Sequence, residues 1–277
     1  MRSSRTVVFC AIDDLIPISG NPLSGFPDFL DSLADARISS VWVSSRNRHQ
    51  LDTPIRKLGH AGPFIAENGC GVYLPEDYFH LKSERTVRLG RFTCIPVATP
   101  QPAAAQALDS LAEDAGISVV PLRSLSPREA MRNTGLSRQE ADALRRRDFD
   151  ELFFFAGTSD ADLQKFHQRA VERKLSLRRS GSLYSLAAGG NLSKCVQELH
   201  KLYDRARHAR AFAVALTTSG ESPELIKACD RAILLTDRGS SESDATPAAG
   251  RPSAKRLPLF SADTWPQALE AIQNRRF

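Results

Sequence analysis

The sequence predicts an α/β fold in which a parallel-sheet core is interrupted by a smaller α+β domain. Up to residue 90, short apolar runs rich in β-branched residues alternate with helical patterns, as in a parallel sheet with right-handed crossovers. From about Arg91 the rhythm changes, and the alternation returns after residue 187. We therefore expect residues 1–90 and 188–277 to form a Rossmann-like core and residues 91–187 to form the inserted domain.

The first core segment repeats strand and helix. The run TVVFCAI at residues 6–12 is typical of a buried strand. Helical spacing at 26–37 ends before a second apolar run at 38–43. A helical pattern at 51–58 and a short strand at 63–66 follow. This repetition is the reason for expecting a parallel sheet.

The inserted segment combines helices with antiparallel strands. Residues 175–179 and 183–187 predict a strand pair joined by a turn at Ser180-Gly181. The other elements expected in the insert are helices at 102–115, within 126–147 and at 160–174, and a strand at 152–157. In the returning core we expect helices at 193–209, 223–229 and 264–274, and strands at 211–216 and 232–235.

Composition and charge exclude several classes of protein. The chain has 277 residues, of which 42% are hydrophobic and 25% charged, with a net charge of +5. The sequence has no basic platform interleaved with aromatic residues of the kind that binds single-stranded nucleic acid. No stretch approaches the ~18 apolar residues of a membrane span. The five cysteines are isolated and form no C-x-x-C pair. This favours a reducing cytoplasm and argues against a zinc site.

Four segments in order along the chain resemble a known family. They are FIAENGCGVYLPEDYF at 64–79, TGLSRQEADALRRRDFDE at 134–151, RSGSLYSLAAGG at 179–190 and DTWPQA at 263–268. Together they are similar to segments of the mannosyl-3-phosphoglycerate phosphatases of the haloacid dehalogenase (HAD) superfamily, which carry a Cof-type cap. The resemblance covers nearly the whole chain. It implies a HAD-like core, a mobile α+β cap over a phosphate site, and hydrolysis of a phosphomonoester.

The resemblance also implies a particular set of catalytic groups. An aspartate at the end of the first strand attacks phosphorus, and a second aspartate two residues later acts as acid and base. Residues i and i+2 of a strand face the same side, so both carboxylates can reach one phosphate. A hydroxyl and a lysine hold the phosphoryl oxygens, and further aspartates hold Mg²⁺. This is covalent catalysis with electrostatic stabilisation.

The nucleophile is missing from this sequence. Alignment on residues 7–9 puts Ala11 at the nucleophile, Asp13 at the acid/base and Asp14 at a glycine of the D-x-D-G-T motif. Moving the register so that Asp13 attacks would make Leu15 the second acid, so the motif would still be absent. A methyl group cannot attack phosphorus.

The metal-binding aspartates are missing as well. The segment ALTTSGES at 215–222 places Thr218 and Ser222 at these positions. Glu221 is the acid that remains, and it could reach the metal region or simply favour a helix N-terminus. Mg²⁺ prefers carboxylate oxygens. We therefore expect no bound metal, and Mg²⁺ only if activity is retained.

Two other motifs are partly preserved. Ser44 lies at the phosphate-binding hydroxyl, although a serine at a strand-to-helix turn can equally cap the helix that follows. In the third motif the ungapped register places Leu192 at the lysine. Lys194 lies two residues later and would point about 200° away on a helix, so a solvated Lys194 is the simpler interpretation.

Several polar residues remain as candidates for ligand contact. They are Arg46 and Asn68 in the core, and Arg147, Arg179 and Tyr184 in the cap. Each has a structural alternative, such as an ion pair for Arg147 or a place in the cap sheet for Tyr184. Loss of two carboxylates raises the local potential, so an anionic ligand could bind without metal.

These observations leave three hypotheses about function. The first is a pseudoenzyme that has lost phosphatase activity and binds a phosphorylated sugar or glycerate, or regulates a protein partner such as a glycosyltransferase. The second is a weak or rearranged phosphomonoester hydrolase that uses Asp13, Glu221 and Lys194. The third is a structural role with a collapsed pocket. An assay with and without Mg²⁺ separates the first two.

Overall fold

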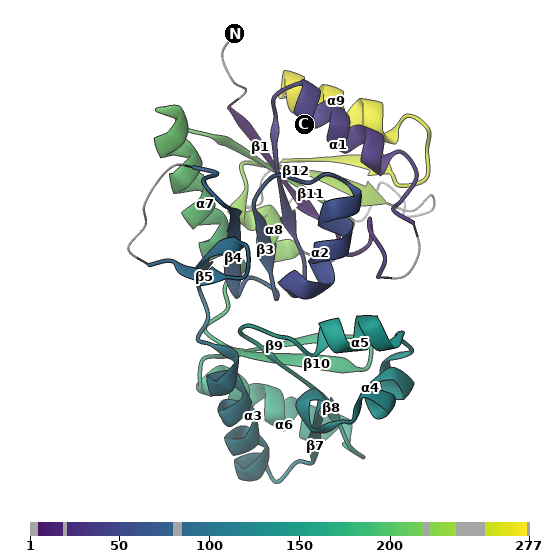
Figure 1. Ribbon diagram of the computed structural model, residues 1–277, viewed down its shortest axis with the longest axis vertical. Coiled ribbons are helices and arrows are strands. Elements are labelled where there is room, and N and C mark those ends of the chain that lie inside the picture. Colours follow the sequence, from purple (N-terminus) through teal and green to yellow (C-terminus); the bar gives the residue numbers. More distant parts are fainter. Residues whose placement is uncertain (1–4, 19–20, 80–84, 219–221, 237–252, 276–277) are drawn as a thin grey trace.

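The structure is a computed structural model that describes residues 5–18, 21–79, 85–218, 222–236 and 253–275 (Figure 1). Within these residues the strands form two sheets, one of nine strands and one of four. The nine-stranded sheet has the order β13-β12-β11-β1-β2-β3-β4-β6-β5, and the four-stranded sheet has the order β7-β8-β10-β9. In Figure 1 the larger sheet and its helices lie above the smaller sheet, which forms the cap.

The core sheet is built from both ends of the chain. Its first part contains β1 (Thr6–Ala11), α1 (Phe26–Asp35), β2 (Ser39–Val43), α2 (Arg48–Lys57), β3 (Phe64–Ala66), β4 (Gly71–Pro75), β5 (Val87–Leu89) and β6 (Phe92–Pro96). Its second part contains α7 (Leu192–Arg207), β11 (Phe212–Thr218), α8 (Pro223–Ala228), β12 (Arg231–Thr236), β13 (Ala254–Pro258) and α9 (Thr264–Asn274). The strands from β13 to β3 pair in parallel, as the sequence predicted for the core, although β13 itself was not expected.

One edge of the sheet differs from the prediction. Strands β4, β6 and β5 pair antiparallel, and none of the three was expected. Because β6 (Phe92–Pro96) pairs with β4, a strand inside the range 91–187 expected for the cap belongs to the core sheet. On this pairing the cap would begin after Pro96. These strands are only three to five residues long and β5 is largely exposed, so the sequence gives only a weak signal for them.

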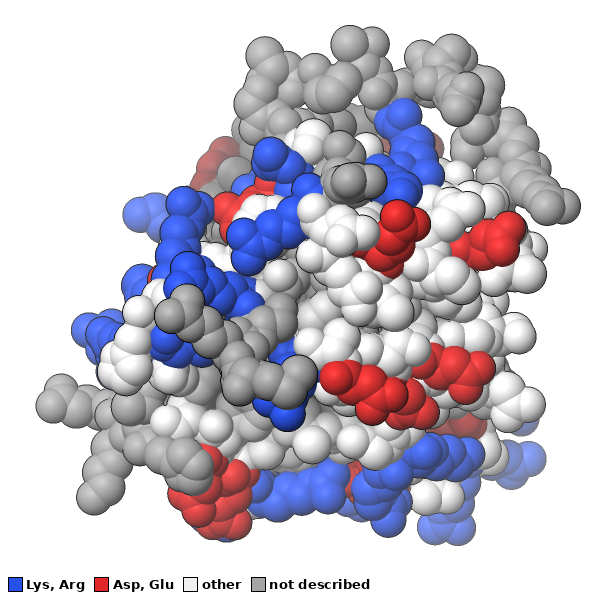
Figure 2. Space-filling model, turned by 90° about the horizontal axis from the view of Figure 1, so that it is seen from above, with Lys and Arg blue, Asp and Glu red and all other residues white. Residues whose placement is uncertain are grey.

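Helices cover both faces of the core sheet. Along β1, Val8 and Cys10 pack with residues of α1, α2 and α9, whereas Val7 and Phe9 pack with α7 and α8. Both sides of the strand are therefore fully buried, which explains its continuous apolar sequence. Figure 2 views the core end that faces away from the cap, where basic side chains gather at the left and along the lower edge and most acidic ones lie on the neutral surface between them.

The cap has one sheet covered by helices. It contains α3 (Gln101–Ala115), β7 (Val119–Pro121), a 3₁₀ turn (Leu122–Ser124), α4 (Pro127–Thr134), α5 (Arg138–Leu144), β8 (Glu151–Phe155), α6 (Asp160–Glu172), β9 (Leu175–Ser180) and β10 (Leu183–Ala188). Helices α3 and α6 pack on one face of its antiparallel sheet. Ser126 and Ser137 begin α4 and α5 with capping boxes, which define where these two short helices start.

The turn between β3 and β4 brings the chain close to α7. Glu67, Asn68 and Gly69 all have positive φ, and Gly69 has φ +90°. A Cβ on Gly69 would lie 2.5 Å from the backbone nitrogen of Leu192 and 2.6 Å from its Cα. Glycine is therefore required at this position both by the backbone conformation and by the close approach of α7.

We expect Gly69→Ala to lower the free energy of unfolding by about 2 kcal/mol or more, because strain and a backbone clash combine. Gly116→Ala is the matched control, since Gly116 has φ +67° and a Cβ added there would meet no atom within 4 Å. That change should cost about 1 kcal/mol from conformational strain alone. Urea denaturation of both variants measures the difference, and equal losses would show that the approach to Leu192 is unimportant.

Candidate functional site

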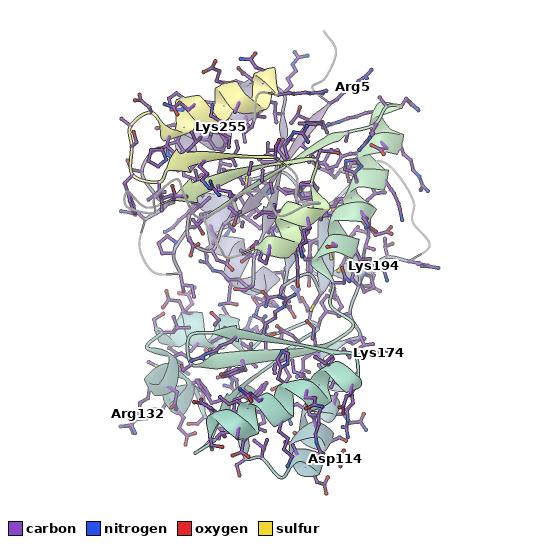
Figure 3. All side chains as sticks on the ribbon, turned by 180° about the vertical axis from the view of Figure 1, so that it is seen from behind. Arg5, Asp114, Arg132, Lys174, Lys194 and Lys255 are labelled. Atoms are coloured by element: carbon purple, nitrogen blue, oxygen red, sulfur yellow. The ribbon has the colours of Figure 1, made fainter. Side chains whose placement is uncertain are left out.

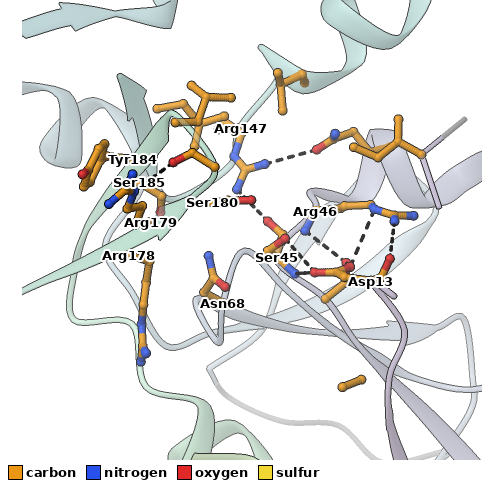
Figure 4. A pocket seen from close by; sticks show the side chains of 18 of the residues that line it. Asp13, Ser45, Arg46, Asn68, Arg147, Arg178, Arg179, Ser180, Tyr184 and Ser185 are labelled. Carbon is orange, nitrogen blue, oxygen red and sulfur yellow. Dashed lines mark hydrogen bonds and ion pairs between the residues drawn. The ribbon is translucent and has the colours of Figure 1, made fainter. Parts of the chain in front are cut away.

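An open cleft lies between the carboxyl ends of the core strands and the cap. Its volume is about 930 Å³, and Figure 4 shows part of its lining. Because the cleft is open, it argues against the third hypothesis, a purely structural role with a collapsed pocket. The expected site residues that line it are Ala11, Asp13, Ser44, Arg46, Asn68, Arg147, Arg179, Tyr184 and Ser222. Glu221 lies outside the described residues.

Asp13 is held tightly by the residues that follow β2. Its carboxylate accepts hydrogen bonds from Ser44 Oγ, from the Ser45 backbone N at 2.8 Å and from Ser45 Oγ at 2.6 Å. Arg46 Nε lies 3.6 Å from its Oδ1. The Ser44 hydroxyl, expected to bind phosphate, thus donates a hydrogen bond to Asp13 instead, and Figure 4 shows Asp13 beside Ser45 and Arg46.

The Arg46 guanidinium fixes the loop around Asp13. Its Nη2 donates to the backbone oxygens of Asp13, at 3.2 Å, and of Ile16. The side chain is only 7% exposed, and burial lowers its pKa while Asp13 and Asp14 oppose this effect. Arg46 therefore stabilises the loop as well as lining the cleft.

The positions of the metal ligands do not fit Mg²⁺. Ala11 presents a methyl group at the end of β1, and Thr218 Oγ1 donates a hydrogen bond to Asp14. Thr218 is not among the cleft-lining residues, although Ser222 is. Among the described residues no group of three or more histidine, cysteine or acidic side chains could hold a metal ion. A hard divalent cation would thus lack the carboxylates it prefers here.

A buried carboxylate joins the core to the cap. Glu67 accepts hydrogen bonds from the backbone N–H groups of Asp148, Phe149 and Asp150 at 3.0, 2.9 and 3.0 Å. Its side chain is fully buried. Burial raises the pKa of Glu67 to about 7, although the charge of Arg147 acts in the opposite direction. Glu67 lies within one of the four segments that resemble the phosphatases, but no role was predicted for it.

Arg147 lies in an ion pair at the same junction. It binds Asp150 through Nε and through Nη2, the latter at 2.7 Å, and it also donates to the Ser45 carbonyl at 3.0 Å. Its side chain is 5% exposed. Burial acts to lower its pKa, but the charges of Asp150 and Glu67 raise it above the ordinary value. These contacts match the structural alternative stated for Arg147, even though the residue also lines the cleft.

The register of the cap sheet separates two neighbouring arginines. Arg179 is opposite Tyr184, and Arg178 is opposite Ser185. Tyr184 packs against Phe155 at 4.7 Å between ring centroids, with Arg179 over its ring at 5.6 Å. Arg178 instead faces the core, where it forms an ion pair with Glu224 of α8 at 2.5 Å. Alternation along β9 shows that Arg178 and Arg179 point to opposite faces of the cap sheet. Only the pairing of β9 with β10 shows that Arg178 points to the face that meets the core.

Asn68 and the residues of α7 complete the site. Asn68 lines the cleft from the β3–β4 turn (Figure 4). Leu192, which stands at the lysine position, also lines it. Lys194 is exposed on the outer side of the first turn of α7 (Figure 3) and does not line it. The cleft thus contains an alkyl side chain where the sequence motif has an amine.

Two curated phosphatases resemble the chain in sequence. No known protein-family model matches the chain. It is 23% identical over 206 residues to the glucosyl-3-phosphoglycerate/mannosyl-3-phosphoglycerate phosphatase of Methanococcoides burtonii, covering 74% of this chain and 75% of the relative. It is 21% identical over 208 residues to the mannosyl-3-phosphoglycerate phosphatase of Pyrococcus furiosus, covering 75% and 82%.

Solved structures share the whole architecture. A phosphatase of the HAD superfamily from Bacteroides thetaiotaomicron aligns with a TM-score of 0.62 at 15% identity, covering 99% of this chain and 97% of that one. A haloacid dehalogenase-like hydrolase from B. subtilis aligns with a TM-score of 0.59 at 12% identity, covering 97% and 99%. The chain therefore has the fold of the HAD superfamily. Within it, the sequence is similar to the mannosyl-3-phosphoglycerate phosphatases, as the four segments indicated.

Proposed function

We propose that this protein is a non-catalytic relative of the phosphatases that binds a phosphorylated sugar or glycerate in its cleft. The observation that carries the proposal is the pairing of an open cleft with a neutral Ala11 at the end of β1 and a neutral Thr218 at the end of β11. Phosphoryl transfer by a carboxylate requires acidic side chains there. Loss of a nucleophile in other covalent enzymes costs on the order of 10⁶ in rate.

The cleft retains features of a ligand site. Its volume of about 930 Å³ is within the range usual for small-molecule sites. Cationic side chains Arg178 and Arg179 and the polar Asn68 line it, and no metal is needed to attract an anion to such a surface. The relatives' names support a hexosyl-phosphoglycerate as the class of ligand. The five buried, free cysteines support a cytoplasmic location.

The described surface gives little evidence about a membrane or a protein partner. In the described residues no helix is both long enough and apolar enough to pass through a membrane. Regulation of a protein partner such as a glycosyltransferase stays part of the proposal. Such a partner would detect whether a ligand occupies the cleft.

The test measures turnover and binding on the same preparation. We expect hydrolysis of glucosyl-3-phosphoglycerate and of p-nitrophenyl phosphate, with and without Mg²⁺, to be at least about 10⁴-fold slower than with the M. burtonii relative. Calorimetry should detect binding of glucosyl-3-phosphoglycerate without metal. Turnover within about a hundredfold of the relative, abolished by Asp13→Asn, would establish the rearranged hydrolase instead.

A further inference from the structure

The donors around Asp13 form a complete anion-binding group. They are a backbone N–H and a hydroxyl from Ser45, the Ser44 hydroxyl and the Arg46 guanidinium. Oδ2 of Asp13 accepts two of these hydrogen bonds, at 2.6 and 2.8 Å from the Ser45 atoms. Charge-assisted bonds of this kind, from backbone, hydroxyl and guanidinium groups, are also those that hold phosphate and sulfate oxygens.

These donors would remain in place without the Asp13 carboxylate. Ser44 is 4% exposed, and its Oγ also accepts a hydrogen bond from the Arg46 backbone N at 3.1 Å. The Arg46 side chain is bound to the backbone oxygen of Ile16. The Ser45 backbone is fixed by Arg147, which donates to its carbonyl at 3.0 Å. Removal of the carboxylate would therefore leave partly buried donors that need an acceptor.

We propose that Ser44, Ser45 and Arg46 form a metal-independent oxyanion site that Asp13 fills as an internal ligand. A carboxylate tethered directly beside the donors has an effective concentration of at least the order of millimolar. It competes with any free oxyanion, and its charge repels the second anion. Asp13 thus acts as a specificity-determining residue that excludes a phosphoryl group from this part of the cleft.

The position of Asp13 limits where the anionic group of the proposed ligand can bind, and only this point rests on the proposed function. If a phosphorylated sugar binds in the cleft while Asp13 stays bound, its anionic group lies away from Ser44 and Ser45. Arg178, on the cap side of the cleft beside Arg179, is an available cation, because its partner Glu224 is 42% exposed and a surface ion pair exchanges at little cost.

The test uses inorganic phosphate and the full-length chain. Asp13→Ala should bind phosphate at least tenfold more tightly than the wild type in a calorimetric titration without metal. Asp14→Ala is the matched control, because it removes the same charge from the adjacent exposed residue, whose carboxylate contacts Thr218. We expect its affinity for phosphate to change by less than threefold. Adding Ser45→Ala to Asp13→Ala should remove the gain.

Three results would overturn the inference. They are an equal gain in the Asp13 and Asp14 variants, no gain in the Asp13 variant, and a gain that survives Ser45→Ala. If thermal melting shows Asp13→Ala to be unfolded, Asp13→Asn keeps the shape and removes the charge, and it must still bind phosphate at least threefold more tightly. Absence of sugar-phosphate binding by the wild type would contradict the proposed function alone, since the phosphate titrations do not depend on it.

Discussion

Replacing Glu67 by alanine is expected to lower the free energy of unfolding by about 3–5 kcal/mol. The carboxylate accepts three backbone N–H groups from residues 148–150, and two of the three donors are buried. Alanine would leave these donors without a partner, and each unsatisfied buried group costs about 1–3 kcal/mol. Arg147 would also lose a nearby negative charge, although Asp150 would still bind it.

Urea denaturation at constant pH measures this change. Glu76→Ala is the control, because Glu76 forms an exposed ion pair with Arg88 and accepts no backbone hydrogen bond from the cap. Its effect should be within the error of the measurement. A loss of less than about 1 kcal/mol in Glu67→Ala would contradict the assigned role, since it would mean that water replaces the carboxylate at little cost.

The same variant reports the charge state of Glu67. Its pKa is raised from 4.5 to about 7 by burial, so folding favours the protonated form. The stabilisation that follows from this shift is fully present below pH 4.5 and is lost as pH rises through about 7. The destabilisation caused by Glu67→Ala should therefore be larger at pH 5 than at pH 8. The opposite trend would show that the carboxylate is favoured by folding.

Restoring the nucleophile alone is expected to leave the protein inactive. Ala11→Asp supplies a carboxylate, but Leu192 still lacks an amine, and Thr218 and Ser222 still lack the carboxylates that Mg²⁺ prefers. Catalytic groups that act as a unit are strongly non-additive. Combining Ala11→Asp with Asp14→Gly, Leu192→Lys, Thr218→Asp and Ser222→Asp should give Mg²⁺-dependent turnover at least about 10³-fold above Ala11→Asp.

Initial rates with p-nitrophenyl phosphate, with Mg²⁺ or with EDTA, test this expectation on folded protein. The combined variant without Ala11→Asp is the control, since it should bind the metal and remain inactive. Mg²⁺-dependent turnover by Ala11→Asp alone would show that other groups already hold the metal. A folded combined variant with no activity would show that the bonds between Asp13 and Ser44–Ser45 prevent catalysis on their own.

The sequence predicted the architecture where the pattern was local. The buried strand β1 was found from its continuous apolar run and helices such as α9 from helical spacing, and α9 has the predicted bounds, 264–274. Strands β4 to β6 were missed because each is only three to five residues long and β5 is largely exposed, so none of them has the long apolar run of a buried strand. The turn at Glu67 to Gly69 joins β3 and β4; the Asn68-Gly69 pair is typical of such a hairpin turn, a local signal that the prediction did not use.

The candidate site was less accessible to sequence reasoning. The register that placed Leu192, and not Lys194, toward the cleft followed from helix geometry. In contrast, the choice of Arg179 over Arg178 required knowledge of which face of β9 meets the core. The partners of Asp13 and Glu67 come from segments 31 to 83 residues away, so no local pattern could have indicated that these carboxylates are already bound.

The contacts between α2 and α5 limit how the cap can move. The chain crosses between core and cap only at residues 97–100 and 189–191 within its described part, and two crossings side by side define an axis of rotation. Asn47 Nδ2, at the start of α2, adds an attachment away from these crossings by donating to the carbonyls of Ala143 and Leu144 at 2.8 and 3.3 Å (α2 and α5 in Figure 1). The bonds of Glu67 to residues 148–150 and the ion pair of Arg178 with Glu224 also join the two parts. Tilting the cap about the crossings must therefore break several of these bonds together.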